Sequence, residues 1–301
     1  MKKSKFASLF LASTLLVGVL SGCNSEGGSG DGGDTIKIGI NLELSGGVAS
    51  YGQSEDKAID LAVEEINDDG GIDGKKIELV KVDNKSDAGE ATSGAIKLIT
   101  KDKVVAIIGA ATSGNTVAQV EVAGKNKVPL ISPSGTSTTV TVTDKGKLNE
   151  FAFRTAFIDP FQGTVAANFA ANELKVKNVA IYADNSSDYA KGLAASFKKD
   201  FEAAGGKIVA QESYVAKDTD FRSTLTSLKS KNPDFIFIPG YYEEVGLIVK
   251  QAREMGITVP LMGADGWDSP DIVDLAGADA LNNTYIITAY SSEDPDGKAK
   301  A

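Results

Sequence analysis

Three polar side chains with complementary chemistry lie in loops that directly follow predicted strands. Ser113 and Thr136 carry hydroxyl groups that can donate hydrogen bonds to a carboxylate, and each has a neighbouring glycine that lets backbone amides approach closely. Ser113 is expected at the start of a helix, where unpaired amides and the positive end of the helix dipole favour an anion. Asp265, in the second half of the chain, is the natural partner for a cation. A ligand with a carboxylate at one end and an ammonium at the other is an α-amino acid.

Each of these residues also has a purely structural interpretation. Ser113 could simply cap its helix, since serine is common at that position. Asp265 could close a turn with Gly266. The same choice applies to three aromatic residues near strand ends, which could wall an apolar pocket or serve only in packing: Tyr51, Tyr189 and Tyr241.

The composition excludes several classes of chemistry. The sequence contains no histidine and a single cysteine, which excludes a Ser-His-Asp triad, a histidine-ligated zinc and an internal disulfide. The net charge of −10 argues against a nucleic-acid partner, because such binding needs a basic surface. We therefore expect a binding protein rather than an enzyme, with no cofactor and no metal.

Two glycine motifs resemble nucleotide-binding fingerprints without their structural context. Residues 28–33 read G-x-G-x-x-G, but no predicted strand precedes them and no helix follows. Residues 109–114 have the spacing of a phosphate-binding loop, but Asn115 stands where that motif needs a lysine. Neither motif therefore indicates a nucleotide.

Strands and helices alternate along the chain in two successive runs of similar size. Strict alternation predicts parallel sheets with right-handed crossovers, whose ligands bind at the carboxyl ends of the strands. The fold class is therefore α/β, with two doubly wound parallel-sheet lobes and a ligand cleft between them. The first run has strands at 36–42, 77–82, 104–108, 128–131 and 151–156 and helices at 53–69, 88–100 and 116–125. The second run has helices at 160–174, 189–204, 221–230 and 245–255 and strands at 179–182, 208–214, 235–238, 260–262 and 285–288. The helix at 53–69 carries a stripe of apolar residues at helical spacing: Ala58, Leu61, Ala62 and Ile66.

The first 35 residues are predicted to lie outside the fold. Residues 1–22 combine a lysine-rich start with an uncharged stretch, which is typical of a signal peptide, and end in a lipobox before Cys23. The alternative is a transmembrane anchor, but serine and glycine interrupt the stretch. The chain then divides into the signal peptide (1–22), a lipidated Cys23 with a flexible linker (23–35), a first lobe (36–156), a second lobe (157–290) and the start of a return toward the first lobe (291–301).

Several short runs together resemble a known family. They include TIKIGINLELSGGVASYG from Thr35, VVAIIGAATSG from Val104, VPLISPSGTS from Val128 and PLMGADGW from Pro260. The sequence is similar to the branched-chain amino-acid (Leu/Ile/Val) substrate-binding lipoproteins of ABC transporters, of the periplasmic-binding-protein type I class. The resemblance implies an extracytoplasmic receptor, lipid-anchored to the cell membrane of a bacterium, that captures its ligand in an interlobe cleft and delivers it to permease subunits. A monomer that touches the membrane only through its lipid is implied.

The resemblance also implies roles for particular residues. The positions of Ser113 and Thr136 bind the ligand carboxylate, and that of Ser134 offers a carbonyl to the ammonium. Asp265 matches the carboxylate that pairs with the ammonium, although some relatives have glutamate there. The remaining positions would contact or close over the ligand's side chain: Tyr51, Ala111, Thr112, Tyr189 and Tyr241.

One departure from the family pattern concerns the C-terminus. Family members usually continue after the second lobe and return to complete the first, whereas this chain stops where that return would begin. We therefore expect the C-terminal part of the fold to be missing. The alternative functions are a sensory module of the same fold, or a binding protein for another small amphipathic ligand such as an aromatic amino acid or a short amide.

Overall fold

The computed structural model describes residues 35–290, which form two parallel β-sheets with helices packed against them. The predicted signal peptide, Cys23, most of the linker, the motif at 28–33 and the terminal stretch 291–301 lie outside the described residues. The predicted fold class is confirmed, since every pairing between strands of the two sheets is parallel. Among the described residues, no helix has both the length and the apolar character needed to cross a bilayer.

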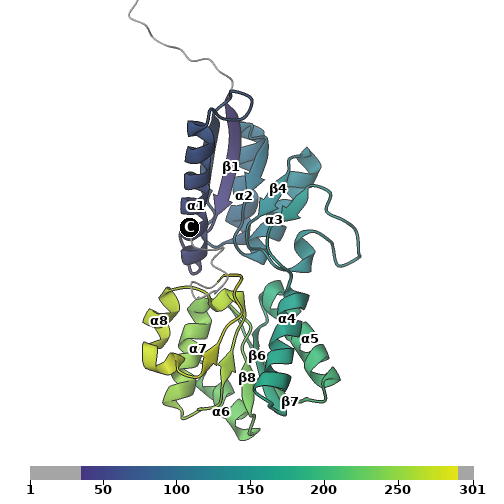
Figure 1. Ribbon diagram of the computed structural model, residues 1–301, viewed down its shortest axis with the longest axis vertical. Helices are drawn as coiled ribbons and strands as arrows, with labels where there is room; N and C mark the ends of the chain where they lie inside the picture. Colours follow the sequence, from purple (N-terminus) through teal and green to yellow (C-terminus); the bar gives the residue numbers. More distant parts are fainter. Residues whose placement is uncertain (1–34, 291–301) are drawn as a thin grey trace, which may run out of the picture. The chain divides into compact units, whose positions relative to one another are not determined.

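The first sheet and its helices, here called the first lobe, fall within the range 36–156. The strand order is β2-β1-β3-β4-β5. Its strands are β1 (Ile36–Leu42), β2 (Ile77–Asp83), β3 (Ala106–Ile108), β4 (Leu130–Ser132) and β5 (Ala152–Arg154). Its helices are α1 (Ala49–Asp68), α2 (Ala88–Lys97) and α3 (Ser113–Asn126), which Figure 1 shows beside β1 and β4.

The second sheet and its helices, the second lobe, fall within the range 157–290. The strand order is β10-β9-β8-β6-β7. Its strands are β6 (Asn178–Asp184), β7 (Lys207–Tyr214), β8 (Phe235–Phe237), β9 (Leu261–Met262) and β10 (Thr284–Tyr285). Its helices are α4 (Asp159–Asn168), α5 (Asp188–Ala203), α6 (Arg222–Ser230), α7 (Tyr242–Glu254) and α8 (Asp271–Ala276), which surround β6 and β8 in Figure 1. The helix predicted over 160–174 is α-helical only to Asn168, and a wider π-type turn, Phe169–Glu173, follows it.

Stacked aromatic rings form part of the core of the second lobe. Phe197 of α5 lies with its ring centroid 4.3 Å from that of Phe237 and 5.5 Å from that of Phe201. All three side chains are fully buried. Burial on both faces explains why β8 reads as a continuous apolar run in the sequence.

Helix α1 does not bury the apolar stripe that its sequence suggests. Leu61 and Ile66 are 57% and 39% exposed, and Gly52 is the only fully buried residue of the helix. The contact with the first lobe's core is made instead by neighbours such as Tyr51 and Ile59, which pack against the buried cluster of Ile40, Leu42 and Ala111. The helix predicted from the spacing of the stripe is confirmed, and the stripe itself lies on an exposed face of that helix.

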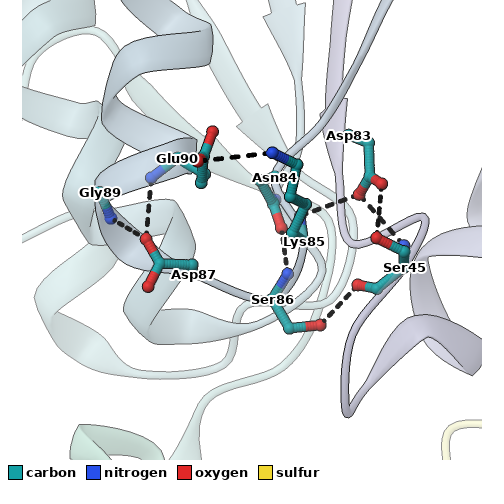
Figure 2. A network of polar contacts seen from close by, with 8 residues as sticks. All are labelled: Ser45, Asp83, Asn84, Lys85, Ser86, Asp87, Gly89 and Glu90. Carbon is teal, nitrogen blue, oxygen red and sulfur yellow. Dashed lines mark hydrogen bonds and ion pairs between the residues drawn. The ribbon is translucent and has the colours of Figure 1, made fainter.

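A network of polar contacts holds the loop that leads into α1 (Figure 2). The carboxylate of Asp83, at the end of β2, accepts hydrogen bonds from the Ser45 amide (3.1 Å), the Ser45 hydroxyl (2.6 Å) and the Lys85 amide (2.8 Å). The Ser86 hydroxyl donates to the Ser45 carbonyl at 2.9 Å. Asp87 caps α2 by accepting from two amides of its first turn. The first turn of α1, which carries Tyr51, is thereby fixed relative to β2.

We expect the aromatic stack to determine much of the stability of the second lobe. Replacing the buried Phe237 by alanine leaves a cavity, so Phe237→Ala should lower the free energy of unfolding by about 3–5 kcal/mol in a urea titration. Phe153→Ala is the matched control, because Phe153 is 49% exposed on β5, and its effect should stay within about 0.5 kcal/mol. Equal losses in the two variants would contradict this assignment of the core.

Candidate functional site

A cavity lies between the two lobes at the carboxyl ends of their strands. It contains about 320 Å³ of space free of atoms, a volume that includes open solvent at its mouth. The lining comprises every residue that the sequence suggested for ligand binding, together with Gly266: Tyr51, Ala111, Thr112, Ser113, Ser134, Thr136, Tyr189, Tyr241 and Asp265. The structure thus brings the whole predicted set together, and direct contact with a ligand stays a prediction.

Ser113 is the first residue of α3 and does not act as its cap. The residue at the cap position is Thr112, whose backbone is extended and whose side chain makes no capping hydrogen bond. The Ser113 Oγ accepts a hydrogen bond from the Ser137 amide at 3.0 Å, so its own proton remains able to donate. The purely capping interpretation is therefore wrong, and the hydroxyl lies where an anion at the helix N-terminus would meet it.

A buried glutamate organises the loop that carries Ala111 to Ser113. Glu43 follows β1 and has no exposed surface. Its carboxylate accepts hydrogen bonds from the Ala111 amide (2.9 Å), the Thr112 amide (3.0 Å), the Thr112 hydroxyl (2.7 Å) and the Asn115 side chain (2.8 Å). Two amides at the N-terminal end of α3 are therefore already occupied, and only donors from Ser113 onward remain for a ligand.

An arginine holds the neighbouring loop in place through hydrogen bonds, as Glu43 holds the first. Arg154, on β5, donates to the carbonyl of Gly135 (3.1 Å), the carbonyl of Ser137 (2.6 Å) and the hydroxyl of Thr141 (2.7 Å). These bonds fix the segment that contains Thr136, which is 1% exposed. The two hydroxyl-bearing loops of the first lobe are thus each held by one buried or half-buried charged side chain.

Asp265 lies on the opposite side of the cavity, at the end of the loop after β9. Its Oδ1 accepts hydrogen bonds from the Tyr189 hydroxyl at 2.7 Å and the Gln162 side chain at 2.9 Å, and its amide donates to the Gln162 Oε1 at 3.1 Å. Burial raises the pKa of Asp265, although these hydrogen bonds act in the opposite direction. Asp265 also opens the short helical turn Asp265–Trp267 with Gly266, so its carboxylate is held by long-range contacts in addition to that local turn.

Three tyrosines form one wall of the cavity. The rings of Tyr189 and Tyr241 are stacked, with centroids 5.0 Å apart and planes inclined by 9°. Tyr51, from the first lobe, meets Tyr241 edge-on at 6.1 Å and donates a hydrogen bond from its hydroxyl to the Gly266 carbonyl. Burial raises the pKa of all three hydroxyls well above the usual value. They are consequently neutral and offer an apolar surface.

Three acidic side chains near the cavity were not predicted as functional from the sequence: Glu43, Glu55 and Asp159. Glu43 is the residue directly after the predicted strand at 36–42, so its place in a loop that follows a strand was a signal for it. Glu55 of α1 accepts a hydrogen bond from Ser134, and burial raises its pKa to about 8. Asp159 begins α4, and both its oxygens are buried. The positions of Glu55 and Asp159 gave no comparable signal, since neither follows a strand of its own lobe.

Comparisons with known proteins agree with this geometry. The sequence profile of the family described as "Periplasmic binding protein" matches residues 35–301. The leucine-, isoleucine-, valine-, threonine- and alanine-binding protein of Pseudomonas aeruginosa is 32% identical over 266 residues, which cover 88% of this chain and 70% of that protein. The crystal structure of the branched-chain amino acid transporter substrate-binding protein LivJ of Streptococcus pneumoniae, in complex with isoleucine, aligns with a TM-score of 0.81 and 48% identity. The alignment covers 87% of this chain and 73% of LivJ.

A structure with a different ligand also aligns with this chain. It is a solute-binding protein of an ABC transporter from Rhodopseudomonas palustris, in complex with 3,4-dihydroxybenzoic acid. The TM-score is 0.72 and the identity 27%, with coverage of 82% of this chain and 66% of the neighbour. Relatives of the same fold therefore hold either amino acids or aromatic acids.

The four hydrogen bonds of Glu43 lead to a specific prediction. A glutamine amide cannot accept from all four donors, so Glu43→Gln should lower the free energy of unfolding by about 1–3 kcal/mol for each donor that loses its partner. Hydrogen exchange at the amides of Ala111 and Thr112 should accelerate, and binding of an α-amino acid should weaken.

The control for this experiment is Glu90→Gln on α2, where the glutamate side chain is 49% exposed. It should leave both the amide exchange and the stability within the error of the measurement. If exchange at Ala111 and Thr112 stayed as slow in Glu43→Gln as in the wild type, Glu43 would not anchor this loop.

Proposed function

The chain belongs to the periplasmic binding protein family, and from this premise we propose that it captures a branched-chain amino acid between its lobes and delivers it to an ABC permease. One observation carries the proposal. A single cavity brings together the Ser113 hydroxyl at the N-terminus of α3 and the half-buried carboxylate of Asp265, with three tyrosines beside them. Those features match the carboxylate, the ammonium and the apolar side chain of such a ligand.

The proposed arrangement assigns one end of the ligand to each lobe. The first lobe receives the carboxylate, through the hydroxyls of Ser113 and Thr136 and the free amides of α3. The second lobe receives the ammonium, through Asp265, with the Ser134 carbonyl as a further acceptor. The apolar side chain lies against Ala111 and Thr112 on one side and against the tyrosine wall on the other.

An aromatic acid without an amino group is the competing ligand, because a relative holds dihydroxybenzoate. Such a ligand supplies no cation for Asp265. The carboxylate would then stay buried without a compensating charge, which is costly in a protein interior. This charge argument favours a zwitterion, and it leaves an aromatic amino acid as the alternative within the same site.

Calorimetric titration with leucine, isoleucine, valine, phenylalanine and benzoate tests the proposal. The branched-chain amino acids should bind most tightly, and benzoate should fail to bind. Asp265→Asn should weaken leucine binding by roughly 2–5 kcal/mol, because the buried ammonium loses its charged partner. Ser113→Ala should weaken it roughly 10- to 150-fold, the equivalent of one hydrogen bond to a charged group.

The two variants are distinguished with isoamylamine, which has the side chain and ammonium of leucine but no carboxylate. The Ser113→Ala effect should disappear with this amine, whereas the Asp265→Asn effect should persist. If Ser113→Ala weakened the amine and the amino acid equally, the carboxylate would lie elsewhere. Tight benzoate binding would show that the function belongs to the aromatic-acid class.

The protein is extracytoplasmic, because proteins of the periplasmic binding protein family act outside the cytoplasm. We further propose that Cys23 carries a lipid anchor, supported by its position after Leu-Ser-Gly and by its being the single cysteine of the sequence. Two or more acyl chains on this residue would hold the protein firmly on the membrane.

The anchor is tested by Cys23→Ser. This variant should remain unprocessed or appear in the medium, because it has no thiol to acylate. Fractionation of cells and medium, followed by immunoblotting, measures the outcome. Normal membrane retention of the processed variant would contradict the proposed anchor.

A further inference from the structure

Glu55 of α1 is an acidic side chain that the ligand arrangement described above does not use. It is not among the residues that line the cavity, but it reaches the loop after β4 and contacts the Ser134 hydroxyl there. Its second oxygen, Oε2, is buried and has no hydrogen-bond partner within residues 35–290. A buried oxygen without a partner costs free energy, and the cost is greater when the oxygen carries charge. The surroundings of Glu55 therefore favour the neutral carboxyl group.

The Ser134 hydroxyl has one proton and two neighbouring acceptors. Its Oγ lies within hydrogen-bond distance of the Glu55 Oε1 and is 2.8 Å from the Ala111 carbonyl oxygen. A hydroxyl group donates one hydrogen bond and can accept others. Both contacts can be full hydrogen bonds only when Glu55 supplies the second proton. A chain then runs from the Glu55 carboxyl group to the Ser134 hydroxyl and on to the Ala111 carbonyl.

This chain joins the two loops that carry the hydroxyls proposed to bind the ligand carboxylate. Ala111 lies two residues before Ser113, and Ser134 lies two residues before Thr136. The Ser134 proton thus links the loop after β3 to the loop after β4, close to the donors of both. The direction of that one hydroxyl group therefore affects how the two loops are held relative to each other.

A second carboxylate faces Glu55 from the end of β1. Helix α1 passes close to Glu43, since a Cβ added at Gly52, three residues before Glu55, would lie 2.3 Å from the Glu43 carbonyl oxygen. Burial raises the pKa of Glu55 to about 8, with Glu43 acting in the same direction and Ser134 in the opposite one. Asp56, the next residue of α1, is paired instead with Lys81 at 2.8 Å. At neutral pH most molecules therefore carry a proton on Glu55.

We propose that Glu55 is a positioning residue that must carry its proton for tight ligand binding, because that proton sets the direction of the Ser134 hydroxyl. The inference rests on the proposed function and deepens it, since it names a residue outside the cavity that controls affinity. When Glu55 is ionised, Ser134 donates to it, and the Ala111 carbonyl loses its donor. A ligand carboxylate at the same loops adds a further negative charge, which disfavours the ionised form in the complex.

The proton exchange has a definite sign. A ligand carboxylate raises the pKa of Glu55, so binding takes up a proton. With a starting pKa of about 8, uptake should approach about 0.1 proton per ligand at pH 7, about 0.5 at pH 8 and about 0.9 at pH 9. This uptake should by itself make leucine bind about tenfold more weakly at pH 9 than at pH 7.

The experiment is calorimetric titration of the full chain with leucine at pH 7, 8 and 9, in pairs of buffers with different ionisation enthalpies. The wild type is compared with Glu55→Gln at each pH, so that titration of the ligand amine and of other groups cancels in the ratio. The glutamine amide donates to Ser134 at every pH. This variant should bind leucine within about twofold of the wild type at pH 7 and about tenfold more tightly than the wild type at pH 9. The proton uptake assigned to Glu55 should be absent from it.

Thermal unfolding without ligand establishes that the variant folds. The raised pKa means that the wild type loses stability as the pH rises from the unfolded value of about 4.3 to about 8. Glu55→Gln should therefore melt at a higher temperature than the wild type at pH 8, and the difference should shrink toward pH 5.

Two further variants test the route and the specificity of the effect. Ser134→Ala removes the middle of the chain, so it should weaken leucine binding roughly 2- to 10-fold at pH 7 and lose the pH effect that distinguishes the wild type from Glu55→Gln. Glu64→Gln is the matched control, because Glu64 is an exposed glutamate of the same helix. It should keep the affinity, the proton uptake and the pH dependence of the wild type.

The remaining outcomes separate this inference from the proposed function. A wild-type protein that binds leucine with the same pH dependence and proton uptake as Glu55→Gln would overturn the inference alone. A folded Glu55→Gln variant that bound leucine tenfold more weakly than the wild type at pH 7 would also overturn it, since the neutral donor would not suffice. A wild-type protein that binds none of the amino acids tested would overturn the proposed function and the inference together.

Discussion

The carboxylate of Glu43 is the interaction on which the geometry of the cavity depends. It ties the end of β1 to the N-terminal end of α3 through four hydrogen bonds and is completely enclosed. Hydrogen bonds to an ionised acceptor are stronger than neutral ones, so the loop of Ala111 to Ser113 has little freedom. The helix end therefore already contains one anion of the protein's own, and a ligand carboxylate meets only the donors that Glu43 leaves over.

The charges around the cavity are distributed unequally between its two sides. Hydroxyls and amides of the first lobe face one end, while Asp265 and Asp159, at the other end, have no cation bonded to them among the described residues. A ligand that carries a positive charge at that end relieves the repulsion, whereas a simple anion increases it. The electrostatics of the protein thus support the same ligand class as the placement of its hydrogen-bond donors.

The two lobes contact each other directly beside the cavity, on the side of α1. Val48 packs within the core cluster of the second lobe. Ser50 makes two hydrogen bonds across the boundary: its amide donates to the Tyr242 hydroxyl at 3.2 Å, and its hydroxyl accepts from that of Ser269 at 2.9 Å. Tyr51 completes this set by reaching the Gly266 carbonyl. The network around Asp83 that fixes the start of α1 (Figure 2) therefore also sets how the first lobe meets the second.

The sequence by itself determined the α/β alternation and the positions that surround the cavity. Apolar periodicity and glycines at the ends of elements are local patterns, so they can be recognised in the sequence. Because parallel strands place all their carboxyl ends at one edge of a sheet, the loops that follow the strands must lie close together.

The tertiary structure alone decided which polar groups are already hydrogen-bonded to one another. Glu43 and Thr112 are 69 residues apart and Gln162 and Asp265 are 103 residues apart, so their pairing depends on strand order and side-chain rotamers that no local pattern encodes. The same reason explains why the apolar stripe of α1 faces outward and why Asp159 lies beside Asp265 without a partner. Burial and pairing are properties of neighbours distant in the sequence, and only the folded chain brings those neighbours together.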